Sequence, residues 1–447
     1  MRKLFGTDGI RGVAGEFPLD KKTIYAIGRA LGDHVPPGQR RIVIGQDTRE
    51  SSGWIADVLS GGLRDSGVHV ESAGVIATPG IAYLTRTRGF SAGVVVSASH
   101  NPWQDNGIKV FGSDGYKLAD EIELEIETEI FALLKEHHAF TPAIPSGFSI
   151  PGDEHLRHAY VQSLAHPIPG AERLHAVIDC ANGAASALAE KVFAGGGLQL
   201  HMTHSAPNGH NINEKCGALH PDIVAAEVVA RKADFGICFD GDADRALFTD
   251  HRGQVVNGDA VMLLLARQLK EQGRLAGDTV VATTMSNMGL EIALREAGIK
   301  MLRAPVGDKY VLEEMKKHGA VLGGEQSGHI ILARESTTGD GMLTAVHVLE
   351  VLARSGKQLC DLVAGLKVFP QIIKNIRVRE KRPLDQLPEV LTAIGAAEKE
   401  LDGNGRVNVR YSGTETLARV MVEAASEETI HRHANAIGAA IQKALGA

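Results

Sequence analysis

The chain has 447 residues, of which 44% are hydrophobic and 23% charged, and its formal net charge is −7. At roughly 150 residues per domain, this length predicts two to four domains, and the acidic balance disfavours sequence-independent nucleic-acid binding, which needs a basic footprint. The 51 glycines exceed the usual share of about 7%, whereas aromatic residues make up only 4%. Many close backbone approaches and few stacking surfaces favour an α/β enzyme acting on small polar substrates.

Neither the cysteines nor the N-terminal segment indicates export. The four cysteines are scattered without a CxxC pair, which favours reduced thiols over a disulfide framework. The opening MRKLFGTDGIRG has no apolar run behind its basic residues, so it does not resemble a signal peptide, and no segment approaches the roughly 18 apolar residues of a membrane span. We therefore expect a cytoplasmic protein with no membrane partner.

The first part of the chain alternates expected strands and helices. In order, its segments are a buried strand with a polar loop at 40–49, a helix at 52–67, strands at 68–75 and 91–99, and an acidic helix at 119–138. This rhythm is typical of βαβ units and a mostly parallel sheet. Three prolines and two glycines at 139–153 predict a linker after it.

The rest of the chain repeats this pattern twice and then changes. A second unit runs from a strand, turn and helix at 175–186 to two strands that flank a charged loop at 234–250. A third begins near Val256 and shows the same pattern at 279–298 and 320–333. After 368–373, short alternating strands and a closing helix predict a small α+β domain. We therefore expect three similar α/β units and one C-terminal domain of another kind.

The most informative short stretch is FDGDADR at 239–245. Asp240, Asp242 and Asp244 alternate in a tight loop between apolar strands, and carboxylates so close repel one another unless a cation neutralises them. Oxygen-only ligands indicate Mg²⁺ or Ca²⁺. An EF-hand would need Gly and Glu where this chain has Arg245 and His251, so that alternative fails. A solvated acidic turn stays open as a second interpretation.

A second stretch, VVVSASHNPWQDNGIKV at 94–110, delivers Ser99 from an apolar strand into a loop of small and polar residues. A nucleophilic serine usually needs a neighbouring base. His100 is adjacent in sequence, but we expect neighbouring side chains in an extended segment to point apart. No GxSxG elbow is present, so a hydrolase triad has weak support and a plain polar turn stays open.

Four motifs in a fixed order carry a resemblance over essentially the whole chain: SASHNP at 97–102, DGDADR at 240–245, GEQSGH at 324–329 and RYSGTE at 410–415. With them the chain resembles the α-D-phosphohexomutase superfamily. The resemblance implies an α/β fold of three similar α/β domains with mixed sheets, plus a C-terminal α+β domain, around a central active-site cleft. It divides the chain into a phosphoserine domain (1–150), a metal-binding domain (151–255), a sugar-binding domain (256–367) and a C-terminal phosphate-binding domain (371–447).

Finer features resemble the bacterial phosphoglucosamine mutase branch of that superfamily. They are FGTDGIRG at 5–12, DCANGA at 179–184, NINEKCG at 211–217, MSNMGLE at 285–291, and Gln326 where the phosphomannomutase/phosphoglucomutase branch typically has Met. The branch implies interconversion of glucosamine 6-phosphate and glucosamine 1-phosphate through a phosphoserine and a 1,6-bisphosphate, feeding UDP-N-acetylglucosamine and cell-wall precursor synthesis. It also implies one Mg²⁺ per chain, glucosamine 1,6-bisphosphate or glucose 1,6-bisphosphate as an activating primer, and a homodimer.

The resemblance implies roles for single residues around the reacting phosphate. The metal ligands would be the Ser99 phosphate and the three aspartates described above. The other catalytic residues would be His100, Lys109, Arg11, Arg245 and His329. Lys109 would act as a positive clamp. The ordinary pKa of His329, near 6.5, would suit a general base, although a structural histidine is the alternative.

The remaining motifs would hold the sugar and its second phosphate. Glu325 and Ser327 would bridge adjacent ring hydroxyls, while Gln326 offers an amide to a polar 2-substituent. The stretch RYSGTETLAR at 410–419 would form a phosphate nest from Arg410, Ser412, Gly413, Thr414 and Arg419. Thr416 stands where the family usually has Pro, which predicts a looser phosphate site.

Two other activities stay open at this point. A phosphomannomutase or phosphoglucomutase is disfavoured by Gln326 and the other branch features. A metal-dependent phosphatase could use the same acidic loop, but it would release inorganic phosphate steadily and need no primer. In each case the expected partner is a small phosphosugar, and Lys109, Arg245, Arg410 and Arg419 should make the cleft positive within an acidic chain.

Overall fold

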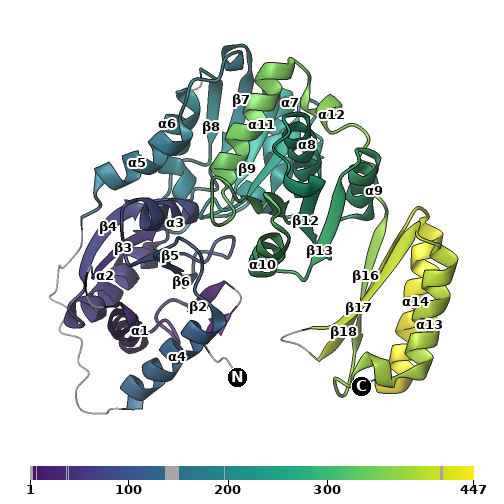
Figure 1. Ribbon diagram of the computed structural model, residues 1–447, viewed down its shortest axis with the longest axis horizontal. Helices are drawn as coiled ribbons and strands as arrows, with labels where there is room; N and C mark the ends of the chain where they lie inside the picture. The colour runs from purple at the N-terminus through teal and green to yellow at the C-terminus, as the bar shows by residue number, and fades with distance from the viewer. Residues whose placement is uncertain are drawn as a thin grey trace. The chain divides into compact units, whose positions relative to one another are not determined.

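The computed structural model describes residues 4–6, 8–36, 38, 40–135, 151–195, 197–412 and 416–446, and most of the predicted linker at 139–153 lies outside these ranges. Its contacts divide the chain into two compact units. The larger takes residues up to 285 together with 299–364, and the smaller takes 286–298 together with the residues from 365 onward. The larger unit contains three mixed sheets and the smaller one a three-stranded antiparallel sheet (Figure 1). The predicted fold class, α/β with several mixed sheets plus a C-terminal α+β part, is thereby confirmed.

The first sheet orders its strands β1-β2-β6-β5-β3-β4. The bounds are β1 (Phe5–Gly6), β2 (Gly9–Val13), β3 (Arg41–Gln46), β4 (His69–Val75), β5 (Ala92–Val96) and β6 (Asp105–Gly112). Strands β3, β4 and β5 run parallel, whereas β6, β2 and β1 are antiparallel to their neighbours. The strand and helix rhythm alone suggested a mostly parallel sheet, which is wrong here because β5 returns through a hairpin instead of a helix.

Helices cover both faces of this sheet, because side chains alternate along each strand. The helices of this region are α1 (Lys21–His34), α2 (Glu50–Asp65), α3 (Thr78–Thr87), α4 (Asp120–Lys135) and α5 (Glu154–Leu164). Ile42 and Ile44 face a core shared with α1, α2 and α4. On the opposite face Gly93 admits α3, since a Cβ there would lie 2.0 Å from the Thr85 hydroxyl.

The second and third sheets repeat this plan with fewer strands. The second runs β11-β10-β9-β7-β8 and the third β13-β12-β14-β15. Their strands are β7 (His175–Asp179), β8 (Gln199–Thr203), β9 (Phe235–Phe239), β10 (Ala246–Asp250), β11 (Val255–Val256), β12 (Thr279–Thr283), β13 (Lys300–Ala304), β14 (Leu322–Gly324) and β15 (Ile330–Leu332). The helices between them are α6 (Ala189–Ala194), α7 (Pro221–Arg231), α8 (Gly258–Glu271), α9 (Met288–Glu296), α10 (Asp308–His318), α11 (Gly341–Ser355) and α12 (Leu359–Leu362).

The three sheets place three of the motifs at equivalent positions. We call residues 97–104 the serine loop, 240–245 the metal loop and 325–329 the sugar loop; they join β5 to β6, β9 to β10 and β14 to β15. In each case the first strand is parallel to one neighbour and antiparallel to the strand that follows the loop. Each loop therefore leaves the carboxyl end of a parallel strand, the edge at which open α/β sheets bind ligands.

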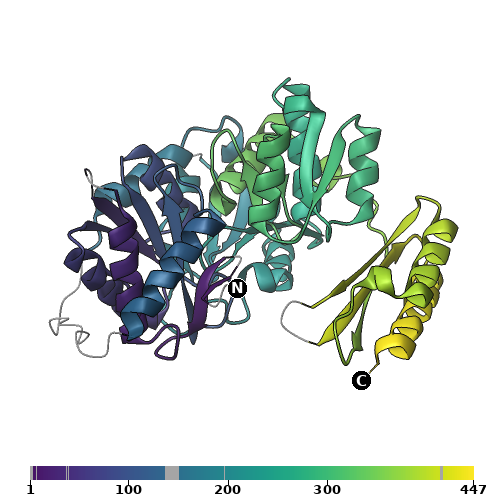
Figure 2. The same cartoon turned by 60° about the horizontal axis from the view of Figure 1, so that its bottom comes forward.

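The smaller unit contains the sheet β16-β18-β17. Besides α9, its elements are β16 (Gln371–Arg377), α13 (Pro388–Leu401), β17 (Gly405–Tyr411), β18 (Leu417–Ala424) and α14 (Glu427–Leu445). Both helices cover one face of the sheet (Figure 2), where Val420 and Val422 meet Ile437 and Ile441 of α14 in one core. Among the described residues, no helix is both long and apolar enough to cross a membrane.

Candidate active site

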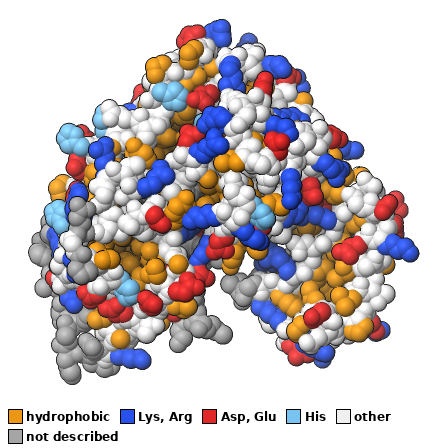
Figure 3. Space-filling model, viewed as in Figure 1, with side chains coloured by type: hydrophobic (Ala, Val, Ile, Leu, Met, Phe, Trp, Pro, Cys, Tyr) orange, Lys and Arg blue, Asp and Glu red, His pale blue; other side chains and the backbone are white. Residues whose placement is uncertain are grey.

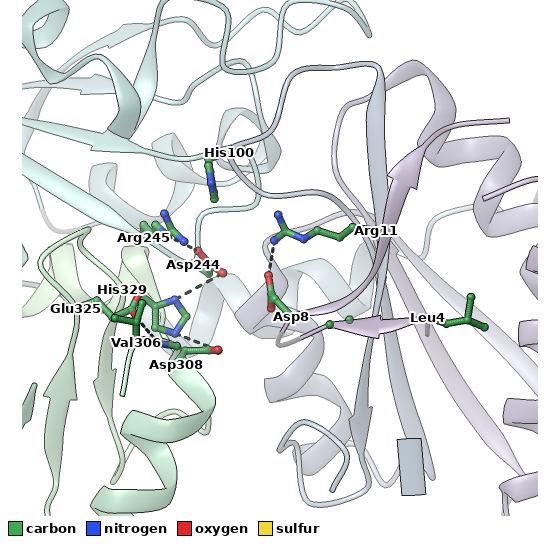
Figure 4. A pocket seen from close by; sticks show the side chains of 13 residues that line it. Leu4, Asp8, Arg11, His100, Asp244, Arg245, Val306, Asp308, Glu325 and His329 are labelled. Atoms are coloured by element: carbon green, nitrogen blue, oxygen red, sulfur yellow. Dashed lines mark hydrogen bonds and ion pairs between the residues drawn. The ribbon is translucent and has the colours of Figure 1, made fainter. Parts of the chain in front are cut away.

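A cavity of about 450 Å³ lies in the larger unit where its motif loops meet (Figure 4). Its walls come from the β1–β2 hairpin, the serine loop, the metal loop, the turn before α10 and the sugar loop. The titratable side chains that line it are Asp8, Arg11, His100, Asp244, Arg245, Asp308, Glu325 and His329. Because carboxylates are as numerous as arginines and histidines, the lining has mixed charge, unlike the positive cleft that the sequence suggested.

Ser99 is next to His100 of the cavity lining and has an unusual backbone conformation. Strand β5 ends at Val96, and Ser99 has φ of +52°, in the left-handed region that non-glycine residues rarely adopt. Its hydroxyl donates to Asp240 Oδ2 at 2.6 Å and lies 3.3 Å from His100 Nδ1. The expectation that Ser99 and His100 point apart is wrong, because the left-handed turn replaces the extended segment on which it rested. Burial, with Arg245 and Arg11 nearby, lowers the pKa of His100 to about 4, so its ring is neutral at pH 7.

The metal loop brings Asp240, Asp242 and Asp244 together. All three are buried and offer oxygen atoms within 4.8 Å of one another. Burial and the two neighbouring carboxylates raise the pKa of Asp240 well above its usual value. In the described part of the chain, Asp242 Oδ1 and Asp244 Oδ1 are buried without a hydrogen-bond partner. Unpartnered oxygens in an all-oxygen donor set fit a hard divalent cation such as Mg²⁺.

Lys109 lies inside this cluster, with only 1% of its side chain exposed. Its Nζ is 2.7 Å from Asp242 Oδ2, 3.4 Å from Asp244 Oδ2 and 3.1 Å from Asp8 Oδ2. Burial alone would lower the pKa of Lys109, but these carboxylates hold it well above its ordinary value. The predicted phosphate clamp is therefore an ammonium that neutralises the acidic cluster.

Six charged side chains form a closed ring of alternating sign through this region: Asp8, Lys117, Asp308, His329, Asp244 and Lys109. Lys117 Nζ lies 2.6 Å from both Asp8 and Asp308. Neither Asp8 nor Lys117 was singled out in the sequence. Their importance depends on contacts between segments far apart in the chain, which no local pattern records.

His329 closes the ring, with Nδ1 3.7 Å from Asp244 Oδ2 and Nε2 3.6 Å from Asp308 Oδ2. Burial alone would lower its pKa, but Asp244, Asp308 and Glu325 raise it to about 9. The backbone N–H of Gly339 donates to His329 Nε2 at 3.1 Å, and this contact disfavours a proton on Nε2. Because three carboxylates outweigh one backbone dipole, we assign a protonated ring at neutral pH. That differs from the free base expected from the ordinary pKa.

The sugar loop turns its residues in different directions. Glu325 lines the cavity, and its two oxygens accept from Gly307 N at 3.1 Å and from the Ser327 hydroxyl at 3.2 Å. Gln326 and Ser327 are not among the lining residues. The Gln326 amide nitrogen donates to Asp259 Oδ2 at 3.3 Å, beneath the loop at the start of α8.

The two predicted arginines of the larger unit both reach the cavity. Arg11 lies on β2, and its guanidinium donates to Asn101 Oδ1 at 3.2 Å and pairs with Asp8. Arg245 ends the metal loop, with Nε 3.7 Å from Asp244 Oδ1. Figure 4 shows both guanidinium groups directed toward the space between His100 and Asp244. They can therefore meet an anion bound there.

The smaller unit carries the predicted phosphate nest. Arg410 and Arg419 lie directly opposite each other on β17 and β18, so two like charges share one face of the sheet. Such a pair is unfavourable unless an anion or another partner compensates it. Arg419 Nη2 lies 3.5 Å from the Ser412 hydroxyl, and Lys381, which the sequence did not single out, donates to Ser412 O at 2.7 Å. Gly413 and Thr414 lie outside the described residues.

A second cluster of metal-ligand types lies where β7 and β8 of the second sheet end: Asp179, His204 and Cys216. The Asp179 carboxylate accepts from Ala181 N at 2.7 Å, from Gly217 N at 2.9 Å and from His204 Nδ1 at 3.0 Å. Burial and the Asp179 charge raise the pKa of the Cys216 thiol to about 12, which disfavours a thiolate ligand. We assign this cluster to the structure of the DCANGA and NINEKCG loops.

On the face drawn in Figure 3, lysine and arginine side chains are interspersed with aspartate and glutamate. This mixture agrees with the net charge of −7 and offers no broad basic stripe on that face. A phosphate-backbone footprint needs such a stripe. A small anion would therefore be attracted by the arginine side chains at the cavity and not by a basic surface.

Comparison with known proteins supplies the family. The family models described as phosphoglucomutase/phosphomannomutase alpha/beta/alpha domain I, alpha/beta/alpha domain III and C-terminal domain match residues 2–137, 257–369 and 373–440. A curated phosphoglucosamine mutase of Koribacter versatilis is 59% identical over 100% of this chain and 98% of its own length. Another, of Solibacter usitatus, is 52% identical over 100% of this chain and 99% of its own.

A solved structure agrees at the level of the fold. A phosphoglucomutase/phosphomannomutase family protein of Burkholderia thailandensis has a TM-score of 0.79 at 24% identity, covering 98% of this chain and 97% of its own. The full-length identity to curated relatives is what decides the family. By that identity, this chain belongs to the phosphoglucosamine mutase family.

Proposed function

We propose that this chain interconverts glucosamine 6-phosphate and glucosamine 1-phosphate through a phosphoserine at Ser99 and a 1,6-bisphosphate intermediate. The observation that carries the proposal is the contact between the Ser99 hydroxyl and Asp240, 2.6 Å apart, in a buried all-oxygen cluster beside a 450 Å³ cavity. A phosphosugar is small enough for such a space. The reaction would feed UDP-N-acetylglucosamine and cell-wall precursor synthesis.

The proposed chemistry moves one phosphoryl group at a time. The P–O bond to Ser99 Oγ breaks as a sugar hydroxyl oxygen bonds to phosphorus, the hydroxyl proton leaves to a base, and Oγ takes up a proton. The bisphosphate turns over and its other phosphate returns to Ser99 by the reverse step. Mg²⁺, held by Asp240, Asp242, Asp244 and the Ser99 phosphate, would supply neutralisation of the phosphate charge.

Residues of the cavity would handle the charge and the protons. Arg11 and Arg245 would stabilise the transferring phosphoryl group from the cavity side. Lys109 would keep the carboxylate cluster neutral enough to accept an anionic substrate. His329, which holds a proton at neutral pH, would donate it to the departing oxygen in one direction and recover it in the other. His100, neutral at pH 7, would line the Ser99 phosphate.

Sugar recognition and the second phosphate complete the proposal. Glu325 would accept hydrogen bonds from the ring hydroxyls. Ser327 would help to hold the sugar loop, and Gln326 would hold the loop or contact the 2-substituent of the sugar. The non-reacting phosphate would be bound in the smaller unit by Arg410, Ser412, Gly413, Thr414 and Arg419, together with Lys381. We retain as proposals the division at 1–150, 151–255, 256–367 and 371–447, glucosamine or glucose 1,6-bisphosphate as primer, a homodimer and a cytoplasmic location.

The test is Ser99→Ala, with the exposed Ser113→Ala as its matched control. Because the phosphoryl carrier is removed, turnover should fall by about a thousandfold or more while the fold persists. Intact-mass analysis should find a phosphate on the wild type and on the Ser113 variant after incubation with glucose 1,6-bisphosphate, and none on the Ser99 variant. Near wild-type turnover in the Ser99 variant would refute the phosphoserine role.

A coupled assay on glucosamine, glucose and mannose phosphates separates the mutase alternatives. A preference for the glucosamine phosphates is expected. Steady release of inorganic phosphate without a primer requirement would favour the phosphatase alternative, which could use the same metal loop.

A further inference from the structure

One fully buried arginine holds the backbone of the serine loop. The guanidinium of Arg49, the residue directly before α2, donates to the carbonyls of Ser99 and Asn101 at 2.9 Å each, to that of Asp105 at 3.0 Å, and to that of Pro102. None of its side chain is exposed. A single side chain thus ties down four carbonyls across seven residues. Only the planar fork of arginine presents donors in this arrangement.

The same turn also fixes the other side of Ser99. Asp47 pairs with Arg49 Nε at 2.8 Å and accepts the Ser97 hydroxyl at 2.7 Å. The Ser97 oxygen in turn accepts the backbone N–H of Ser99 at 3.0 Å. Both backbone polar atoms of Ser99 are therefore held, its carbonyl by Arg49 and its N–H through Ser97. The Asp47 carboxylate compensates the buried positive charge.

The loop needs this support because its conformation is strained. Ser99 has φ of +52°, and Asn213, which donates to Ser99 O at 2.9 Å and Asn101 O at 3.1 Å, has φ of +58°. Gly241 of the metal loop packs so closely that a Cβ there would lie 2.5 Å from Ser99 O. Left-handed non-glycine residues persist only where their surroundings hold them. Here the surroundings direct the Ser99 hydroxyl at Asp240.

We propose that Arg49 is a positioning residue for phosphoryl transfer: it holds the serine loop in the left-handed conformation that aims Ser99 Oγ at the metal loop. The proposal rests on the proposed function for its kinetic consequence, but not for its structural one. Among the residues that the structure describes, Arg49 contacts neither the cavity lining nor the acidic cluster, so its influence passes through the loop backbone. A 1 Å displacement of a reacting atom can cost about a hundredfold in rate.

The test compares Arg49→Lys with Arg41→Lys. Arg41 begins β3, the strand that leads to the turn of Arg49, and pairs with Glu71 at the surface, so it is a matched control. Lysine keeps the charge but cannot reach four carbonyls. In Arg49→Lys, amide hydrogen exchange of a peptide spanning 97–106 should rise about tenfold with α1 and α7 unchanged. The kcat should fall at least about tenfold and KM change by less than about threefold, because substrate contacts remain. The Arg41 variant should match the wild type in all three measurements.

Each outcome decides the proposal. Unchanged exchange at 97–106, or unchanged kcat with raised exchange, would overturn it. Exchange raised throughout the molecule would also overturn it, since that would mark a general loss of stability. If the wild type lacks mutase activity, the proposed function fails, and the exchange measurement still decides whether Arg49 holds the loop. Should Arg49→Lys not fold, Asn213→Gly removes two bonds to the same carbonyls while tolerating the left-handed φ, and the same exchange increase is required.

Discussion

Two clusters of metal-ligand residues lie close to the serine loop, and they differ in how their oxygens are used. In the metal loop, Asp242 Oδ1 and Asp244 Oδ1 are buried without a hydrogen-bond partner in the described structure, and a lysine ammonium enters the cluster. In the second cluster, both Asp179 oxygens accept from backbone N–H groups of neighbouring loops. Residue types and spacing alone cannot distinguish a metal site from a cluster that only stabilises loops. The distinction comes from whether each carboxylate oxygen already accepts a hydrogen bond.

The largest effect is expected from Lys109→Met. Removing the buried ammonium takes away the cation that Asp8, Asp242 and Asp244 share, so the free energy of unfolding should fall by about 3–5 kcal/mol in a metal chelator. Millimolar Mg²⁺ should restore much of this loss, since it would neutralise the same oxygens. Urea denaturation with and without Mg²⁺ measures both. An unchanged stability in chelator would contradict the electrostatic account.

Asp242→Asn tests the metal site directly. The amide keeps the size of the side chain but removes a charged ligand, so Mg²⁺ affinity and turnover should both fall by about a hundredfold. Calorimetric titration and the dependence of rate on Mg²⁺ concentration check this. The same titration on Asp179→Asn is the control and should match the wild type. A wild-type titration curve for Asp242→Asn would remove the metal assignment.

Asp179→Ala should affect stability and leave metal binding alone. Two buried N–H groups lose their acceptor, at about 1 kcal/mol each, so the free energy of unfolding should fall by about 2 kcal/mol. Urea unfolding measures the change. If Zn²⁺ or Mg²⁺ stabilises the wild type but not this variant, the second cluster binds metal and its assignment to loop structure is wrong.

The smallest effect is expected from Cys216→Ser. The thiol is buried, and the Asn182 amide nitrogen approaches it only to 3.9 Å, so the hydroxyl should cost less than about 1 kcal/mol. Thermal unfolding and turnover should both stay near wild type. A large loss of turnover without a loss of stability would indicate that this thiol has a chemical role.

Local pattern predicted most of the fold and the position of each motif. Alternating apolar segments located β5, β9 and β14, and the motif loops follow them because polar residues gather at the carboxyl ends of parallel strands. The mixed character of the sheets was predicted from the resemblance alone. The order of strands and helices in the sequence does not show where two strands are joined by a hairpin and therefore run antiparallel.

The site was harder to predict in detail because its charges come from distant segments. The pKa of His329 depends on Asp308 and Asp244, and the neutrality of His100 on Arg11 and Arg245. The contact of His100 with Ser99 depends on a single left-handed residue. Arg49 could have been noticed in the sequence, because it lies in the charged QDTR turn that follows β3. Since β3 and β5 are parallel neighbours, this turn lies at the same sheet edge as the serine loop.

The ring of Asp8, Lys117, Asp308, His329, Asp244 and Lys109 constrains how this protein can change over evolutionary time. It contains three acids and three bases, so losing any one member leaves an unbalanced buried charge. Single substitutions in the ring should therefore be harmful, whereas exchanges that remove one acid and one base together should be tolerated better. Natural variation at Asp8, Lys117 and Asp308, the members with no assigned part in the chemistry, is then expected to arrive in pairs.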